Sequence, residues 1–156
     1  MRTFEQWMAE YAVSHRHPTN QMIHKICGPP IMLTVLGFLW AIPTPAEMNF
    51  ISPWFNWATI FTFFCLLFYI SLNFKMFLGM LIQVSLMLFI VSRIAVTGYL
   101  VQFSAVVFVL AWIGQFYGHK VEGKKPSFMQ DLAFLLIGPL WVQRFIFKKM
   151  GWIVMD

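Results

Sequence analysis

Four histidines are the residues of this sequence whose type and spacing most directly allow chemistry: His15, His17, His24 and His119. Histidine is the commonest metal ligand in proteins. His15 and His24 are nine residues apart, which on one continuous helix, at about 100° per residue, puts them on opposite sides. They converge only if the chain breaks between them, and Pro18-Thr19-Asn20 provides that break and a fresh helix cap. His17, directly before Pro18, is predicted not to be a ligand.

His119 has an acidic neighbour at helical spacing. Glu122 follows three residues later, so the two side chains share one face of a helix. Its carboxylate is a candidate metal ligand or, alternatively, a group that fixes the tautomer of a ligating histidine. Spacing alone leaves another interpretation open, in which the histidines are simply solvated residues at a membrane surface.

The elements that position these residues belong to a membrane protein. Charged residues make up only 11% of the 156 residues, against about 25% in an ordinary soluble domain, and hydrophobic residues reach 60%. The net charge of +5 comes from Lys and Arg spread along the whole chain. Because they form no basic stripe, we expect no nucleic-acid partner. The excess of basic over acidic residues instead reflects the orientation of the chain in a membrane and contact with the anionic lipids of a bilayer.

Hydrophobic segments predict an all-α integral membrane protein with four transmembrane helices in a single domain, residues 1–156. The expected spans are about 26–42, 54–73, 76–92 and 98–118. Gly28-Pro29-Pro30 is assigned to the first turn of the first span, where the missing proline N–H groups cost nothing. Lys75 and Arg93 are interpreted as span boundaries.

Both ends of the chain are predicted to lie at the membrane surface. In the N-terminal segment, residues 1–25, apolar residues recur at helical spacing and indicate an interfacial helix. The C-terminal helix is expected at about 127–147, with Ser127 and Gln130 spaced as a capping box. Its uncharged stretch, interrupted by Gly138-Pro139, is short for a span and favours a re-entrant or interfacial helix.

Basic residues predict the topology. Lys and Arg precede the first span and follow the second and fourth, whereas the loop after the first span has none. Arg93, after the third span, is the exception. The positive-inside rule therefore places both termini in the cytoplasm. This multi-pass protein is expected in the inner membrane of a bacterium or the endoplasmic reticulum of a eukaryote.

Two motifs resemble those of a known family. One is Tyr11-x3-His15-x2-Pro18-x-Asn20-x3-His24-x3-Gly28-x-Pro30, and the other is Trp112-x2-Gln115-Phe-x-Gly118-His119-x2-Glu122-x3-Pro126. Together they resemble the small membrane family of iron-dependent 2-hydroxy fatty acid dioxygenases, which shorten 2-hydroxy fatty acids by one carbon. The similarity spans nearly the whole chain. One departure is Ser127, where a small alanine is expected.

The resemblance implies an iron site and its substrates. It implies Fe(II) held by His15, His24 and His119, with Asn20, Gln115 and Glu122 in supporting positions. It also implies that a 2-hydroxy fatty acid and O2 give the shortened acid and CO2, without 2-oxoglutarate. The acyl chain is expected among the apolar spans, with its polar head at the metal.

Two further residues are candidate substrate-binding groups. Tyr11 is a candidate hydrogen-bond donor to a ligand, and Arg93 a candidate partner for a substrate carboxylate. The alternative for each is an interfacial anchor.

Three other classes of protein are alternatives. A haem protein with bis-histidine ligation and a non-catalytic membrane scaffold both remain compatible with the sequence. A transporter is disfavoured, because the charges lie at the predicted interfaces and not near the membrane midplane. The oligomeric state is left open.

Overall fold

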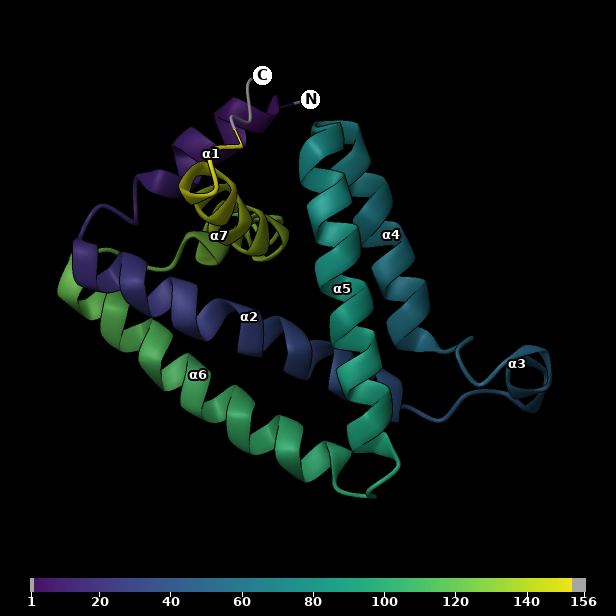
Figure 1. Cartoon of the computed structure of the whole chain (residues 1–156). Helices are drawn as coiled ribbons and strands as arrows, with labels where there is room; N and C mark the ends of the chain where they lie inside the picture. The colour runs from purple at the N-terminus through teal and green to yellow at the C-terminus, as the bar shows by residue number, and fades with distance from the viewer. Residues whose placement is uncertain (1, 153–156) are drawn as a thin grey trace.

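Helices account for every regular element in residues 2–152, the part of the chain that this computed structural model describes, and the predicted all-α class is confirmed. Figure 1 shows their arrangement. The elements are α1 (Phe4–Ala12), α2 (Pro18–Ala41), α3 (Ala46–Ile51), α4 (Trp57–Leu72), α5 (Phe74–Ala95), α6 (Leu100–Glu122), the 3-10 turn η1 (Ser127–Met129) and α7 (Phe134–Lys149).

The N-terminal segment forms two helices with a break between them. α1 ends at Ala12, and α2 begins only at Pro18, whose fixed φ suits the first helical position. The chain therefore leaves helical geometry between His15 and His24, as the sequence predicts. The buried face of α1 packs against α7 and contributes Trp7 to the core.

Two details of α2 correct the sequence analysis. The N-cap is His17, whose Nδ1 accepts a hydrogen bond from the backbone N–H of Thr19 at 3.2 Å, and not Thr19 or Asn20. Pro29-Pro30 lies inside α2 and not in its first turn, because Pro18 already starts the helix well before residue 26. Neighbouring helices can re-satisfy the backbone groups that such prolines free.

α2 and α6 form the central antiparallel pair (Figure 1). Glycines on α6 allow the close approach: a side chain added at Gly114 would meet Cys27 Sγ at 2.8 Å, and one added at Gly118 would overlap Asn20. Small residues play this part in many membrane helix pairs. As a result, the second turn of α2 lies level with the last turn of α6.

α4 and α5 form a second pair that lies across the first (Figure 1). Asn73 ends α4 and also caps α5, since its side chain accepts a hydrogen bond from the backbone N–H of Met76. Buried side chains of α4 and α5 meet those of α1 and α7 in the larger core. Its fully buried members are Tyr69, Met76, Met80, Val84, Ile137 and Leu140.

The predicted count of four transmembrane helices is not confirmed. Within the described residues, α2, α5 and α6 are long and apolar enough to cross a membrane. α4 has 16 residues, short of the roughly 20 that a span requires, because Asn56 caps it and delays its start to Trp57. The loop before it also contains the short helix α3, which was not predicted from the sequence.

The C-terminal helix begins later than predicted. Ser127 and Gln130 form no capping box, because the Ser127 hydroxyl bonds the side chain of Ser14 instead. A 3-10 turn follows, and α7 starts at Phe134. α7 carries Pro139 within its length and is not among the helices long and apolar enough to span.

Candidate metal centre

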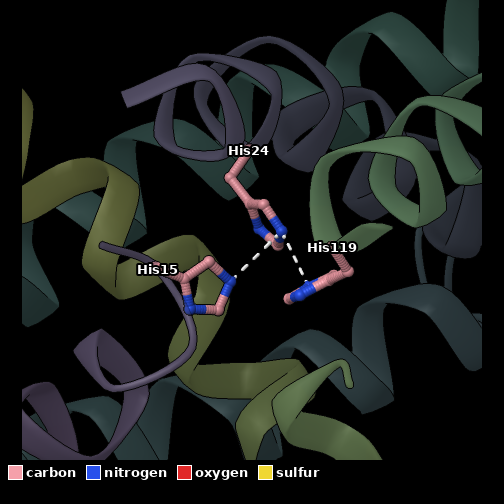
Figure 2. A group of neighbouring side chains, drawn as sticks. All are labelled: His15, His24 and His119. Carbon is pink, nitrogen blue, oxygen red and sulfur yellow. Dashed lines mark hydrogen bonds between the residues drawn. The ribbon is translucent and has the colours of Figure 1, made fainter. Parts of the chain in front are cut away.

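Three histidines from distant parts of the sequence converge on one point (Figure 2). His15 comes from the loop between α1 and α2, His24 from the second turn of α2 and His119 from the last turn of α6. The Nε2 atom of His24 lies 3.1 Å from Nε2 of both His15 and His119. All three side chains are buried, with exposed fractions of 1%, 7% and 5% respectively.

The two 3.1 Å separations fit neighbouring ligands of one ion. Metal–imidazole bonds of about 2.0–2.1 Å place neighbouring ligands of one ion roughly 3.0–3.4 Å apart. In the part of the chain that the structure describes, the group of side chains able to share a metal consists of these three histidines, with ligand atoms within 4.8 Å of one another. The donor set suits a first-row transition metal, for which imidazole is a common ligand.

The remote nitrogens of two rings are held by oxygen atoms. Nδ1 of His15 donates to the backbone oxygen of Tyr11 at 2.7 Å, which leaves its Nε2 lone pair facing the other rings. Nδ1 of His24 lies 3.3 Å from the Tyr11 hydroxyl. Partners of this kind fix the tautomer and orientation of metal-bound histidine. The Nε2 lone pair of His15 is thus available to a cation held between the three rings.

Burial keeps the loop histidine in its metal-binding form. It lowers the pKa of His15 to about 4, so the ring is neutral at neutral pH. A neutral imidazole is the form that binds a metal. Burial also raises the pKa of the Tyr11 hydroxyl, which therefore stays protonated.

Tyr11 supports two of the three rings at once. Its own ring stacks on His15, with centroids 4.0 Å apart and planes 10° from parallel. Its hydroxyl lies beside His24 and its backbone oxygen accepts from His15. Tyr11 also lines the cavity next to the histidines. From the sequence, its expected role is only that of a substrate-binding group or an interfacial anchor.

Glu122 holds the loop that carries His15. Its carboxylate accepts hydrogen bonds from the backbone N–H groups of Arg16 at 2.9 Å and His17 at 2.7 Å. It also accepts one from the Asn20 side chain at 3.3 Å. We call this set of contacts the loop clamp. Glu122 is outside the candidate ligand group, so its carboxylate acts on the loop and not on a ring nitrogen.

Asn20 completes the clamp from α2. Its side-chain amide also donates to the backbone oxygen of Ser14 at 3.0 Å, and the residue is fully buried. The clamp thus joins α2, the loop and the end of α6 around the histidines. Ser14, whose hydroxyl lies 3.2 Å from Nδ1 of His15, is a contact that the sequence analysis missed.

Removing the clamp is expected to weaken metal binding without removing a ligand. In Glu122→Ala three donors lose their acceptor, so the loop holding His15 loosens and metal affinity falls about 10–100-fold. Titration of metal-free protein with Fe(II) measures this change. Glu122→Gln keeps an acceptor oxygen and loses less affinity. The exposed acid Glu47 of α3 provides the control, and equal affinities of Glu122→Ala and Glu47→Ala would contradict the clamp.

A cavity of about 290 Å³ extends from the histidines into the apolar helices. Apart from the histidines, the residues that line it are mostly apolar, and most of them come from α2, α4, α6 and α7. Its lining reaches Val35 on α2, which is eleven residues beyond His24, or about 16 Å along the helix. Phe61 and Phe108 also line it. Gln115 lines it one helical turn before His119.

Arg93 and His17 are not brought to this site. Arg93 is exposed in the last turn of α5 and does not line the cavity. The chain then enters α6 at Leu100, and His119 lies nineteen residues later, about 28 Å along that helix. The candidate role of Arg93 in binding a substrate carboxylate is therefore not supported. His17 is exposed, as expected for a residue that is not a ligand.

The fold and this site define a class: an all-helical protein whose described part has three helices long and apolar enough to cross a membrane, and a buried three-histidine candidate metal centre. The sequence profile of one family, described as 2-hydroxy-palmitic acid dioxygenase Mpo1-like, matches residues 1–150. The chain belongs to this Mpo1-like family, which confirms the resemblance seen in its two motifs. No match was found among curated proteins or among solved structures.

Proposed function

We propose that this protein is an Fe(II)-dependent dioxygenase that cleaves 2-hydroxy fatty acids to the acid one carbon shorter and CO2. The family description names a 2-hydroxy acid dioxygenase. The observation that carries the proposal is the position of the three histidines at one end of a long apolar cavity. A polar head at the metal and an acyl chain among the helices together match that shape.

The proposed reaction is balanced without a further co-substrate. A 2-hydroxy acid and O2 give the shortened acid, CO2 and water, and the substrate supplies all four electrons. Fe(II) bound by the histidines would supply a site for the carboxylate, the α-hydroxyl group and O2. The choice of iron follows the family, because imidazole ligands also suit zinc, copper and nickel.

The protein's own residues contribute binding, orientation and exclusion of water. Tyr11 holds two of the histidine rings in place, and the loop clamp holds the segment that carries His15. The apolar cavity wall provides a water-poor site, which protects reactive species from side reactions. His15, His24 and His119 are the proposed metal ligands. Asn20, Gln115 and Glu122 are proposed to support the site.

The proposed setting is a membrane with the histidines near its cytoplasmic surface. The basic residues predict both termini in the cytoplasm, in a bacterial inner membrane or in the endoplasmic reticulum. That topology requires α4 to cross together with α2, α5 and α6. A tilted or locally thinned bilayer accommodates a short helix at modest cost.

Bis-histidine haem ligation does not fit this geometry. A haem iron needs its two axial nitrogens on opposite faces of a flat macrocycle. Neighbouring Nε2 atoms that lie 3.1 Å apart leave no room for that ring between them. A single non-haem ion is the better match.

A direct assay tests the proposed function. Purified protein in detergent is loaded with Fe(II) without oxygen and then given O2 and 2-hydroxypalmitate labelled with ¹³C at the carboxyl carbon. We expect labelled CO2 and the unlabelled fifteen-carbon acid in equal amounts, with one O2 consumed for each. Protein that holds about one iron per chain and yields neither product would refute the proposal, and a scaffold role would then be favoured.

Filling the cavity beside the histidines is expected to exclude long acyl chains. Gly28 lies one turn after His24 on α2, and a side chain added there meets only Val142, at 3.7 Å. In Gly28→Leu the new side chain enters the cavity from a position one turn beyond His24. We expect binding of 2-hydroxypalmitate to fall at least tenfold, since a good part of its chain loses its apolar contacts.

Iron content and short substrates separate this effect from misfolding. Gly28→Leu is expected to keep about one iron per chain and to bind a short 2-hydroxy acid as the unmodified protein does. Ile26→Phe adds bulk to the exposed side of the same helix and serves as the control. Unchanged affinity of Gly28→Leu for 2-hydroxypalmitate would show that the acyl chain lies elsewhere.

A further inference from the structure

Gln115 has a buried polar group that no described residue satisfies. The side chain lines the cavity on α6, and the residue is only 6% exposed. Its Oε1 atom is buried without a hydrogen-bond partner within residues 2–152. Buried polar groups are nearly always paired in folded proteins, so such an atom calls for a ligand.

The hydroxyl groups around the same cavity already have partners. The Tyr11 hydroxyl lies beside His24, and that of Tyr69 donates to the backbone oxygen of Leu136. Ser127 bonds Ser14. The unpaired polar atoms that remain around this cavity therefore lie on α6. There the indole N–H of Trp112 is also unpartnered, one turn before Gln115.

We propose that Gln115 recognises the head of a 2-hydroxy fatty acid. Its amide oxygen accepts a hydrogen bond from the 2-hydroxyl group, and its amide N–H donates to the carboxylate. A neutral amide offers a donor and an acceptor in one plane, which matches the donor and acceptor of a 2-hydroxy acid. This inference depends on the proposed function, because it places the acyl chain in the cavity.

The spacing along α6 puts the amide where the head must lie. Gln115 precedes His119 by four residues, so the two side chains share one face of the helix. A head group held at the histidines therefore has the amide beside it. The hydroxyl proton stays available to Gln115 even when the hydroxyl oxygen approaches a metal. A plain fatty acid leaves Oε1 unpaired, and this penalty provides discrimination.

Binding to metal-free protein tests the inference, because chelation by a metal then makes no contribution. Full-length protein is stripped of metal, and its affinities for 2-hydroxypalmitate and palmitate are measured by displacement of a fluorescent fatty acid. We expect about a tenfold preference for the hydroxy acid. Gln115→Leu is expected to lose that preference, because its affinity for the hydroxy acid falls more than its affinity for palmitate. Gln102→Leu, at an exposed position of α6, is the control and should match the unmodified protein.

The outcomes separate this inference from the proposed function. If metal-free protein binds both acids equally, or if Gln115→Leu keeps the preference, the role of Gln115 is wrong while the cavity assignment stands. If the unmodified protein binds neither acid even when it is loaded with Fe(II), the proposed function itself fails. Gln115→Glu gives an independent test, since it keeps an acceptor and adds a negative charge. It should retain the hydroxyl preference but bind both acids more weakly, and loss of the preference in it would overturn the inference.

Discussion

Replacing His24 by alanine is expected to remove both the bound metal and the activity. His24 is the middle ring, and its Nε2 lies 3.1 Å from the Nε2 atoms of both other histidines. Loss of a residue that hydrogen-bonds a metal ligand costs about 10–100-fold in metal affinity. Loss of the central ligand itself should therefore cost more. Elemental analysis after Fe(II) loading should show about one iron per chain in the unmodified protein and almost none in His24→Ala.

The fold should survive this change. His24 already borders a cavity, so truncation enlarges an existing space and creates no new one in packed core. Its main tertiary contacts are with the other rings and Tyr11. A thermal unfolding midpoint close to that of the metal-free unmodified protein is therefore expected.

His17 provides the matched control for the histidine experiment. It is exposed and caps α2, and His17→Asn keeps a strong capping side chain while it removes an imidazole. Iron content and activity of His17→Asn should equal those of the unmodified protein. Equal iron content in His24→Ala and His17→Asn would mean that the converging histidines are not the metal site.

The convergence of the histidines is the part of the geometry that local rules could predict. Pro18 sets the end of one helix and the start of the next, because it fixes φ and constrains the residue before it. This break lets His15 approach His24. That His119 joins them from the other end of the chain follows from α2–α6 pairing, which periodicity does not encode.

Contacts between distant residues explain the corrections. Ser127 has the spacing of a capping residue, but its hydroxyl bonds Ser14, 113 residues away, and α7 starts later. Glu122 shares a helix face with His119, but its carboxylate accepts from the backbone of the loop. Local sequence patterns indicate which contacts a side chain can make within its own helix. Contacts with distant residues determine which of these contacts form.

Helix boundaries were misplaced where charges were interpreted as ends. Lys75 and Arg93 lie within α5, which runs from Phe74 to Ala95, and not outside the third span as the sequence predicts. Long basic side chains can extend toward the membrane surface while their backbone stays helical.

The end of α6 follows a different rule. Gly123 takes a positive φ of 70° there and closes the helix as glycine commonly does.

Gly118 is the position where a single added side chain should damage both the fold and the site. It precedes His119 on the face of α6 that meets α2, and a built Cβ would overlap the side chain of Asn20. Asn20 is fully buried and holds the loop clamp, so it has no free space into which to move. A leucine here must either separate α2 from α6 or displace Asn20.

Gly118→Leu is therefore expected to lower stability and to lose iron together. Overpacking of this kind costs about 1–3 kcal/mol, which corresponds to a fall of roughly 2–12 °C in the unfolding midpoint of a chain of this size. Ala105→Leu adds similar bulk to the exposed side of α6 and should change neither quantity. If Gly118→Leu and Ala105→Leu had the same unfolding midpoint and the same iron content, the alignment of His24 with His119 would not depend on the close approach of α2 and α6. If the midpoint fell while iron content stayed at one per chain, the packing would be correct but the histidines would tolerate a wider helix separation than their 3.1 Å contacts imply.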